Sequence, residues 1–120
     1  MIEKVNLAEK LSLFDERWSP KIVADLNDGH VKVVKLDGEF LWHHHDDEDE
    51  LFLVVSGRLR MQFRDKDVVL EPGELVVVPK GVEHCPLAEG ETHVVLIEPK
   101  TTLNTGNVRN ERTVEQLERL

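Results

Sequence analysis

Residues 43–55 have the sequence HHHDDEDELFLVV, in which three histidines precede five acidic and then five apolar residues. Residues 31–42 ahead of them are rich in β-branched and aromatic side chains, so we expect the histidines to end one strand and the acids to lead into the next. Because side chains along a strand alternate between its faces, His43 and His45 should share one face and His44 should point away. Two imidazoles on one face, followed by a carboxylate on the next strand, are the beginning of a metal site.

The length and charge of the chain limit what the protein can be. A chain of 120 residues predicts one domain, residues 1–120. The net charge of −9 repels phosphate backbones and anionic lipids, so we expect no nucleic-acid partner and no membrane partner. The single cysteine, Cys85, rules out an internal disulfide, and no stretch resembles a signal peptide or a membrane-spanning helix. The predicted localisation is cytoplasmic.

Short β-type runs alternate with turn residues through most of the chain. The runs predict strands over residues 21–26, 30–37, 40–45, 50–55, 59–63, 68–70, 75–78, 84–88 and 92–98. About nine short strands joined by tight links indicate an all-β antiparallel sandwich or barrel.

Each end of the chain carries a helical pattern. Apolar residues recur at helical spacing over residues 7–14, and Asn6 is a plausible N-cap for this short N-terminal helix. Near the other end, Thr113 and Gln116 have the spacing of a capping box, which predicts a short C-terminal helix over residues 113–120.

Four residues have the side chains of a metal-binding set. Neutral imidazoles and a carboxylate suit divalent transition metals such as Fe, Mn, Ni and Zn. A divalent ion held by three neutral histidines and one glutamate keeps a net charge near +1, which favours an additional anionic ligand such as a substrate oxygen. A His-x-His pair alone is a weak signal, because such pairs are common on protein surfaces. The candidate ligands are His43, His45, Glu50 and His84.

The same residues fall in two longer patterns, Gly38-x4-His43-x-His45-x4-Glu50-x6-Gly57 and Gly73-x5-Pro79-x-Gly81-x2-His84. These patterns closely resemble the two sequence motifs of the cupin superfamily. The residues 104–107, Asn-Thr-Gly-Asn, extend the resemblance to small single-domain cupins of the mannose-6-phosphate-isomerase-like, "cupin 2" type. The resemblance implies a cupin double-stranded β-helix, a jelly-roll-like β-barrel with its core at about residues 21–98. It also implies one divalent metal bound inside the barrel by the four candidate ligands, and a homodimer.

The chain departs from the family pattern at two places. The first motif usually has five residues between its glycine and its first histidine, whereas this chain has four. Reading the pair as His44 and Asp46 would restore that spacing but would replace an imidazole and shorten the step to the glutamate, so His43 and His45 are preferred. The second motif usually closes with an asparagine where this chain has Ala88, which leaves the contacts around the metal open.

Several other features have more than one interpretation. The acidic residues 46–49 are interpreted as a solvated loop, with control of access to the site as the alternative. Cys85 is interpreted as a small core thiol rather than a nucleophile. In residues 58–64, either the apolar side chains or Arg60 and Gln62 face the barrel interior.

Function depends on the site rather than on the fold. The first hypothesis is a metal-dependent enzyme acting on a small polar molecule, either sugar isomerase-like or dioxygenase-like. His93, Glu91 and Glu98 are candidates for a catalytic base by residue type only. The alternative is a non-catalytic cupin that binds a small molecule or a metal as a sensor and relies on a separate output protein. A polar pocket wall would favour catalysis, and an apolar wall would favour binding.

Overall fold

The architecture comes from a computed structural model, which describes residues 2–120 and contains one short helix and seven strands among them. The elements are α1 (Leu7–Leu11), β1 (Lys21–Leu26), β2 (Gly29–Glu39), β3 (Glu50–Ser56), β4 (Leu59–Phe63), β5 (Asp67–Leu70), β6 (Leu75–Val78) and β7 (His84–Pro99). The predicted all-β class is confirmed. The bounds of β1, β4 and β6 are those predicted, and β5 begins one residue before its predicted start and ends at its predicted end.

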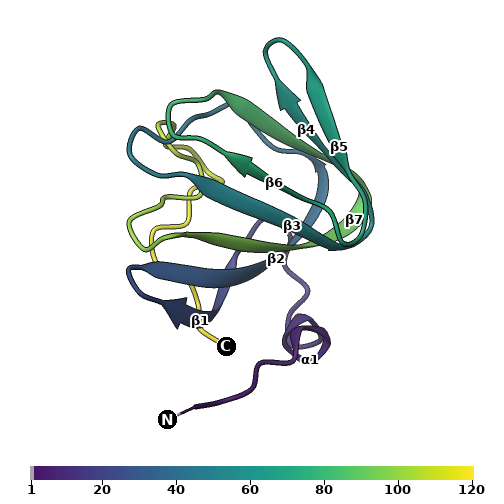
Figure 1. Cartoon of the computed structure of the whole chain (residues 1–120), viewed down its shortest axis with the longest axis vertical. Helices are drawn as coiled ribbons and strands as arrows, with labels where there is room; N and C mark the ends of the chain where they lie inside the picture. Colours follow the sequence, from purple (N-terminus) through teal and green to yellow (C-terminus); the bar gives the residue numbers. More distant parts are fainter. Residues whose placement is uncertain (1) are drawn as a thin grey trace.

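Strand β7 organises the barrel, because it pairs antiparallel with three other strands. Its first half pairs with β4 and with the end of β2, and its second half pairs with β3 and with the rest of β2. One side of the barrel therefore has the strand order β1-β2-β7-β3-β6, and β4 and β5 complete the other side (Figure 1). The expected cupin barrel is confirmed.

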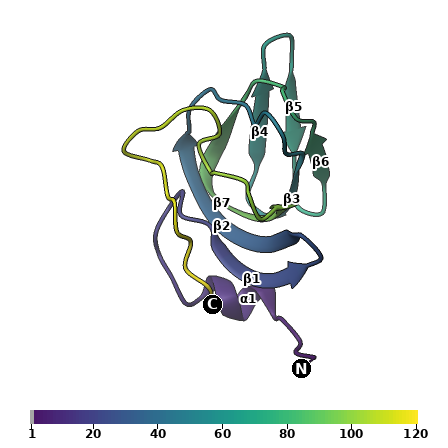
Figure 2. The same ribbon diagram turned by 90° about the vertical axis from the view of Figure 1, so that its left-hand side faces the viewer.

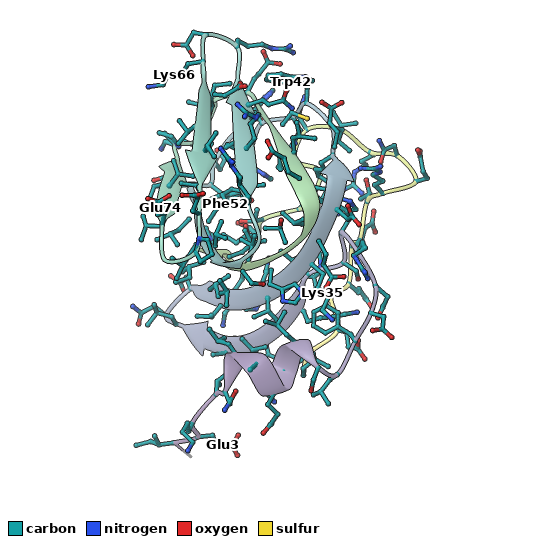
Figure 3. All side chains as sticks on the ribbon, turned by 90° about the vertical axis from the view of Figure 1, so that its right-hand side faces the viewer. Glu3, Lys35, Trp42, Phe52, Lys66 and Glu74 are labelled. Carbon is teal, nitrogen blue, oxygen red and sulfur yellow. The ribbon has the colours of Figure 1, made fainter. Side chains whose placement is uncertain are left out.

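The barrel interior is filled by alternate side chains of the strands. Leu59 and Met61 of β4 are fully buried, so the apolar side chains of this strand face inward. Arg60 and Gln62 face outward, which resolves the choice that the sequence left open. Phe52 also lies within the barrel (Figure 3). Burying a Leu or Phe side chain contributes about 1.5–3 kcal/mol, so this interior supplies much of the stability.

A second apolar cluster lies on the outer face of the barrel, under α1. Leu11 and Phe14 pack there against Val33 of β2 and Val95 of β7. The Oδ1 atom of Asn6 accepts a hydrogen bond of 3.0 Å from the backbone N–H of Glu9, which confirms the predicted N-cap. The helix ends at Leu11, three residues before the predicted end, yet Phe14 remains buried in the cluster.

The predicted helix over residues 113–120 is wrong: within residues 2–120, α1 is the only helix. The end of the chain is instead extended and lies beside β1, close to α1 (Figure 2). The N–H of Ile22 donates to the carbonyl of Glu118, and the N–H of Leu120 donates to the carbonyl of Ile22, both at 2.9 Å. An eight-residue helix is marginal in water, whereas the edge strand offers backbone partners and the outer cluster offers an apolar surface for Leu120.

The structure also differs from the strand prediction at two places. Residues 40–45 form no regular strand, and only His43 makes an isolated bridge, to His84. Residues 89–91, which separate the predicted strands 84–88 and 92–98, lie within the single strand β7, where Gly90 has φ +86°. A glycine with positive φ lets one long strand bend there, so it belongs to both sides of the barrel without a chain reversal.

Candidate metal centre

The structure brings all four predicted ligands together inside the barrel. His43 and His45 precede β3, Glu50 is its first residue, and His84 is the first residue of β7. All four are buried, with at most 4% of any residue exposed. One ligand atom from each residue lies within 4.8 Å of the others. The group is therefore a buried candidate metal site of three histidines and one glutamate.

Backbone hydrogen bonds hold the ligand-bearing segments next to each other. The N–H of His43 donates to the carbonyl of His84 at 3.0 Å, and the N–H of His84 donates to the carbonyl of His43 at 2.9 Å. The N–H of Gly81 donates to the carbonyl of His45 at 2.7 Å. His44 points away from the centre, as predicted, and its Nε2 lies 2.9 Å from Asp46 Oδ1.

The orientation of two imidazoles is fixed by backbone carbonyls. Nδ1 of His43 lies 3.0 Å from the carbonyl oxygen of Leu41, and Nδ1 of His84 lies 2.9 Å from that of Val82. Because a carbonyl can only accept, each Nδ1 carries the hydrogen and donates it. Each Nε2 is therefore left with a lone pair, and a carbonyl partner of this kind is typical of histidines that bind metals.

Glu50 completes the cluster. Its Oε1 lies 2.9 Å from Nε2 of His45 and 3.1 Å from Nε2 of His84. Two ligands at right angles on an ion with bonds of about 2.1 Å would be about 3.0 Å apart. The geometry at His45 makes no hydrogen bond, and its Nε2 is buried without a partner among the described residues. The Nε2 atoms and the carboxylate oxygen converge on one point, where a cation would take the place of the hydrogen bond that His84 Nε2 makes with Glu50 Oε1.

The protonation states of the cluster fit the same role. Burial and the nearby His84 lower the pKa of His43 to about 4, so this imidazole is neutral at neutral pH. Burial alone would raise the pKa of Glu50, but the proximity of His45 and His84 outweighs it and holds that pKa well below the usual range. A neutral imidazole and an ionised carboxylate are the forms that coordinate metals. The residues present therefore fit a divalent transition metal.

A cavity of about 450 Å³, its open mouth included, leads to His43 and Glu50. Beyond the ligands, only Glu98 and Asn104 are polar in its wall. The remaining wall is apolar: Trp18, Pro20, Val34, Leu36, Phe40, Phe52, Pro86 and Leu96.

Aromatic side chains form part of this wall, and the sequence did not identify them as such. The rings of Trp18 and Phe40 stack with their centroids 4.7 Å apart and 11° between their planes. The guanidinium of Arg112 lies 5.7 Å and 5.5 Å from the two ring centroids. Both aromatic residues lie outside the ligand segments, so no local pattern marked their role.

The C-terminal segment packs against the backbone of the histidine segment. Oδ1 of Asn107 accepts a hydrogen bond of 2.9 Å from the N–H of His44, and the N–H of Asn107 donates to the carbonyl of His44 at 3.0 Å. Gly106 packs so closely that an added Cβ would overlap the His44 carbonyl oxygen and lie 3.0 Å from Cδ2 of His43. The Asn-Thr-Gly-Asn segment is thus part of the site.

Of the three residues considered as a base by type, only Glu98 lies at the cavity. His93, which is half-buried, and the exposed Glu91 instead contact each other at 2.9 Å, away from the cavity wall. Burial, and next to it the charge of Glu50, raises the pKa of Glu98 well above its usual range, although the Lys32 ammonium opposes the rise. A cation bound by Glu50 would compensate the charge of Glu50 and would therefore favour the ionised form of Glu98 beside Lys32.

Two further interpretations can be compared with the structure. Cys85 is buried, and burial together with Glu39 raises the pKa of its thiol to about 11, which confirms a core thiol. Asp46, Asp47 and Asp49 are exposed, as expected for a solvated loop, although Oδ1 of Asp49 also accepts a hydrogen bond of 2.8 Å from the N–H of Lys80.

Comparisons with known proteins agree with the fold. A family model described as "Cupin domain" matches residues 29–99. The chain is 41% identical over 85 residues to the uncharacterized protein YdbB of Bacillus subtilis, covering 70% of this chain and 75% of that protein. It is 31% identical over 80 residues to an acireductone dioxygenase of Bacillus licheniformis, where the match covers 62% of this chain and 45% of the dioxygenase.

Solved structures show the same barrel. A cupin-2 domain containing protein from Shewanella frigidimarina superimposes with a TM-score of 0.79 and 48% identity, over 80% of this chain and 94% of that one. Protein NMB1881 from Neisseria meningitidis gives 0.75 and 34%, over 82% and 100% of the two chains. No helix within residues 2–120 is long and apolar enough to cross a membrane.

Proposed function

The chain belongs to the cupin family, as a member of its Cupin_2 group, and on that premise we propose that it is a metal-dependent enzyme acting on a small organic anion. The observation that carries the proposal is the convergence of four buried ligand atoms within 4.8 Å of one another. Burying three imidazoles and a carboxylate is costly unless a bound cation compensates for their lost hydration. His43, His45, Glu50 and His84 would hold that cation.

The chemistry of the bound ion would be Lewis-acid catalysis or, with redox-active iron, reaction with dioxygen. The protein would contribute the rest. The neutral His43 remains available for coordination, and the apolar wall of the cavity that leads to the buried ligands holds the body of the substrate. Iron, manganese, nickel and zinc all suit this donor set, so the ion must be identified by experiment.

A dioxygenase-like reaction has more support than sugar isomerisation. A sugar carries many hydroxyl groups, and each would need a polar partner inside the cavity. Beyond the ligands, the wall offers only Glu98 and Asn104, and both ends of the Asn104 amide are already hydrogen-bonded, to Arg112 and Val114. The 31% identity to an acireductone dioxygenase points in the same direction, although the match spans less than half of that protein.

A small-molecule-binding role without catalysis is the second candidate, because an apolar cavity wall favours binding over catalysis. The cavity wall is mostly apolar. In this role the same four residues would hold the metal, and a ligand would bind without turnover. The response to ligand binding would then come from a separate output protein.

Elemental analysis of the purified, untagged protein tests the metal site. We expect near-stoichiometric iron, manganese, nickel or zinc, and loss of that metal in the His43→Ala/His84→Ala variant. The His93→Ala variant, which removes a histidine outside the cavity wall, is the matched control and should keep its metal. Absence of metal from the wild type, with no uptake on reconstitution, would contradict the proposal. If iron is found, oxygen consumption with candidate substrates then separates an enzyme from a binding protein.

A homodimer also remains a proposal. On the outer face of the barrel, Leu75 and Val77 of β6 are about half exposed, at 54% and 48%. Within the described chain β6 pairs only with β3, so its other edge has free backbone groups. An apolar face beside an open strand edge is a typical site of association between subunits.

A further inference from the structure

A buried ion pair, one member of which lines the cavity, is not explained by the four-ligand site. Lys32 of β2 is 1% exposed and Glu98 of β7 is 4% exposed, and Lys32 Nζ lies 2.5 Å from Glu98 Oε2. Both side chains face the barrel interior, since Lys32 shares the phase of Val34 and Glu98 shares that of Leu96. Apolar residues at such positions are often at least as stabilising as a buried ion pair. The pair therefore suggests a role beyond stability.

Only one carboxylate oxygen of Glu98 is used by this pair. Oε2 is held by Lys32, whereas Oε1 is buried and has no hydrogen-bond partner among the described residues. A buried polar atom without a partner is costly, more so when it carries charge. Because Lys32 fixes the other oxygen, Oε1 has a defined position in the cavity wall, which it shares with His43 and Glu50.

Glu98 is a neighbour of the metal centre rather than a fifth ligand. It does not belong to the set of side chains whose ligand atoms lie within 4.8 Å of one another. It is close enough to Glu50 for the two carboxyls to influence each other. A ligand held at the four-residue centre would therefore have Glu98 beside it and apolar walls on its other sides.

We propose that Glu98 Oε1 accepts a hydrogen bond from the bound ligand, and that the site selects small organic acids with a hydroxyl group next to the carboxylate. This inference rests on the proposed metal site. A centre with net charge near +1 attracts the carboxylate of such a compound, and Glu98 Oε1 receives its hydroxyl hydrogen. Val34, Leu36, Phe52 and Leu96 contact its apolar remainder. Glu98 is then the residue that sets specificity, and Lys32 is a positioning residue.

The test uses protein loaded with Co(II), whose visible spectrum reports ligand binding without turnover. Three 2-hydroxy acids (glycolate, lactate and 2-hydroxyisovalerate) are titrated beside the matching acids without the hydroxyl (acetate, propionate and isovalerate). The preference is the ratio of the affinity for a hydroxy acid to the affinity for the matching acid without the hydroxyl. A hydroxyl group can also coordinate a metal by itself, so a preference of the wild type for the hydroxy acids is expected with or without a contact to Glu98. The decisive quantity is the change in that preference when Glu98 is replaced.

The informative variant is Glu98→Gln. The amide oxygen must accept from Lys32, so the NH2 group occupies the position of Oε1 and can no longer accept a hydrogen bond. We expect the preference for the best hydroxy acid to fall by about tenfold or more, the usual effect of losing a hydrogen bond to a charged group. Glu91→Gln, on the exposed side of the same strand, should leave the preference unchanged.

The outcomes separate this inference from the metal site. Failure of the wild type to bind Co(II) would overturn both. Co(II) binding with an unchanged preference in Glu98→Gln, or with no hydroxy acid bound by the wild type, would overturn the role of Glu98 alone. The Co(II) affinity and the melting temperature of Glu98→Gln are measured in parallel. Lost hydroxy-acid preference counts as support only in a variant that still binds Co(II).

Discussion

Asn107 is hydrogen-bonded to His44 through both backbone groups of that histidine. Its Oδ1 accepts from the His44 N–H at 2.9 Å, and its own N–H donates to the His44 carbonyl at 3.0 Å. His44 stands between two of the candidate ligands, so Asn107 fixes the backbone from which both imidazoles project. The C-terminal segment is in this way connected to the metal centre without contributing a ligand.

Replacement of Asn107 should therefore weaken metal binding. Asn107→Ala removes the side-chain acceptor, which is worth about 1 kcal/mol, or roughly fivefold in affinity. Asn107→Asp keeps an acceptor oxygen and should restore most of the loss. Competition with a chelator measures Co(II) or Zn(II) affinity, and the Co(II) spectrum reports any change in ligand arrangement. Equal affinities for wild type and Asn107→Ala would show that the contact does not position the ligands.

Gly106→Ala should be much more damaging than alanine at another glycine of positive φ. A Cβ at Gly106 would overlap the backbone carbonyl oxygen of His44, which cannot move without displacing the ligands. Gly38 has φ +82° and nothing within 4 Å of the added Cβ, so Gly38→Ala should cost only the backbone strain of about 1 kcal/mol. Urea unfolding compares the two variants, and equal losses of stability would contradict the close packing.

The thiol of Cys85 should be unreactive in the folded protein. It is 1% exposed, and its pKa is raised to about 11 by burial and by Glu39. We expect slow modification by a disulfide reagent such as Ellman's reagent at pH 8, and rapid modification of one thiol after unfolding in guanidinium chloride. A native rate within about tenfold of the unfolded rate would show that the side chain is accessible, because only the thiolate reacts.

The four candidate ligands could be identified from the sequence because their signal is local. His43 and His45 have the two-residue period of an extended chain, so alternation places these two candidate ligands on one face. Glu50 begins the next strand and was identified by its position in the first motif. His84 was identified by the spacing of the second motif. Identifying these residues required no knowledge of how distant parts of the chain pack.

The parts that were missed depend on distant contacts. The stretch 113–120 has a helical cap pattern, but the free edge of β1 and the outer apolar cluster favour an extended conformation. Asn107 and Trp18 acquire their roles only when the chain ends pack against the barrel. Lys32 could have been noticed, because a charged residue at the inward phase of an apolar strand predicts a buried partner.

Association between subunits should depend on the exposed apolar face of β6. Leu75→Lys/Val77→Lys places two charges on that face, and buried like charges from two subunits would disfavour a dimer. We expect the wild type to have the mass of a dimer in light scattering after gel filtration and the double variant to have the mass of a monomer. Lys66→Glu, at the exposed loop between β4 and β5, serves as a control for charge. A wild-type monomer at all concentrations would contradict the proposed dimer.

Acid should destabilise the metal-free protein through His43. The folded-state pKa of about 4 lies below the ordinary value of 6.5, so the unfolded chain takes up the proton at higher pH. The contribution of His43 to the free energy of unfolding is therefore fully present above pH 6.5 and is lost as the pH falls towards 4. A shift of this size corresponds to about 3 kcal/mol.

Two neighbouring carboxyls also titrate in acid, so a variant is needed to isolate the imidazole. Glu50, with its lowered pKa, adds to the acid loss below about pH 4.5, whereas Glu98, with its raised pKa, acts in the opposite direction. Urea unfolding of chelator-treated wild type and His43→Asn between pH 7 and pH 4 gives the difference due to His43. The wild type should lose more stability than the variant over this range, because asparagine has no proton to take up. Parallel curves would mean that His43 titrates normally in the folded protein, and its burial would then not keep it neutral for coordination.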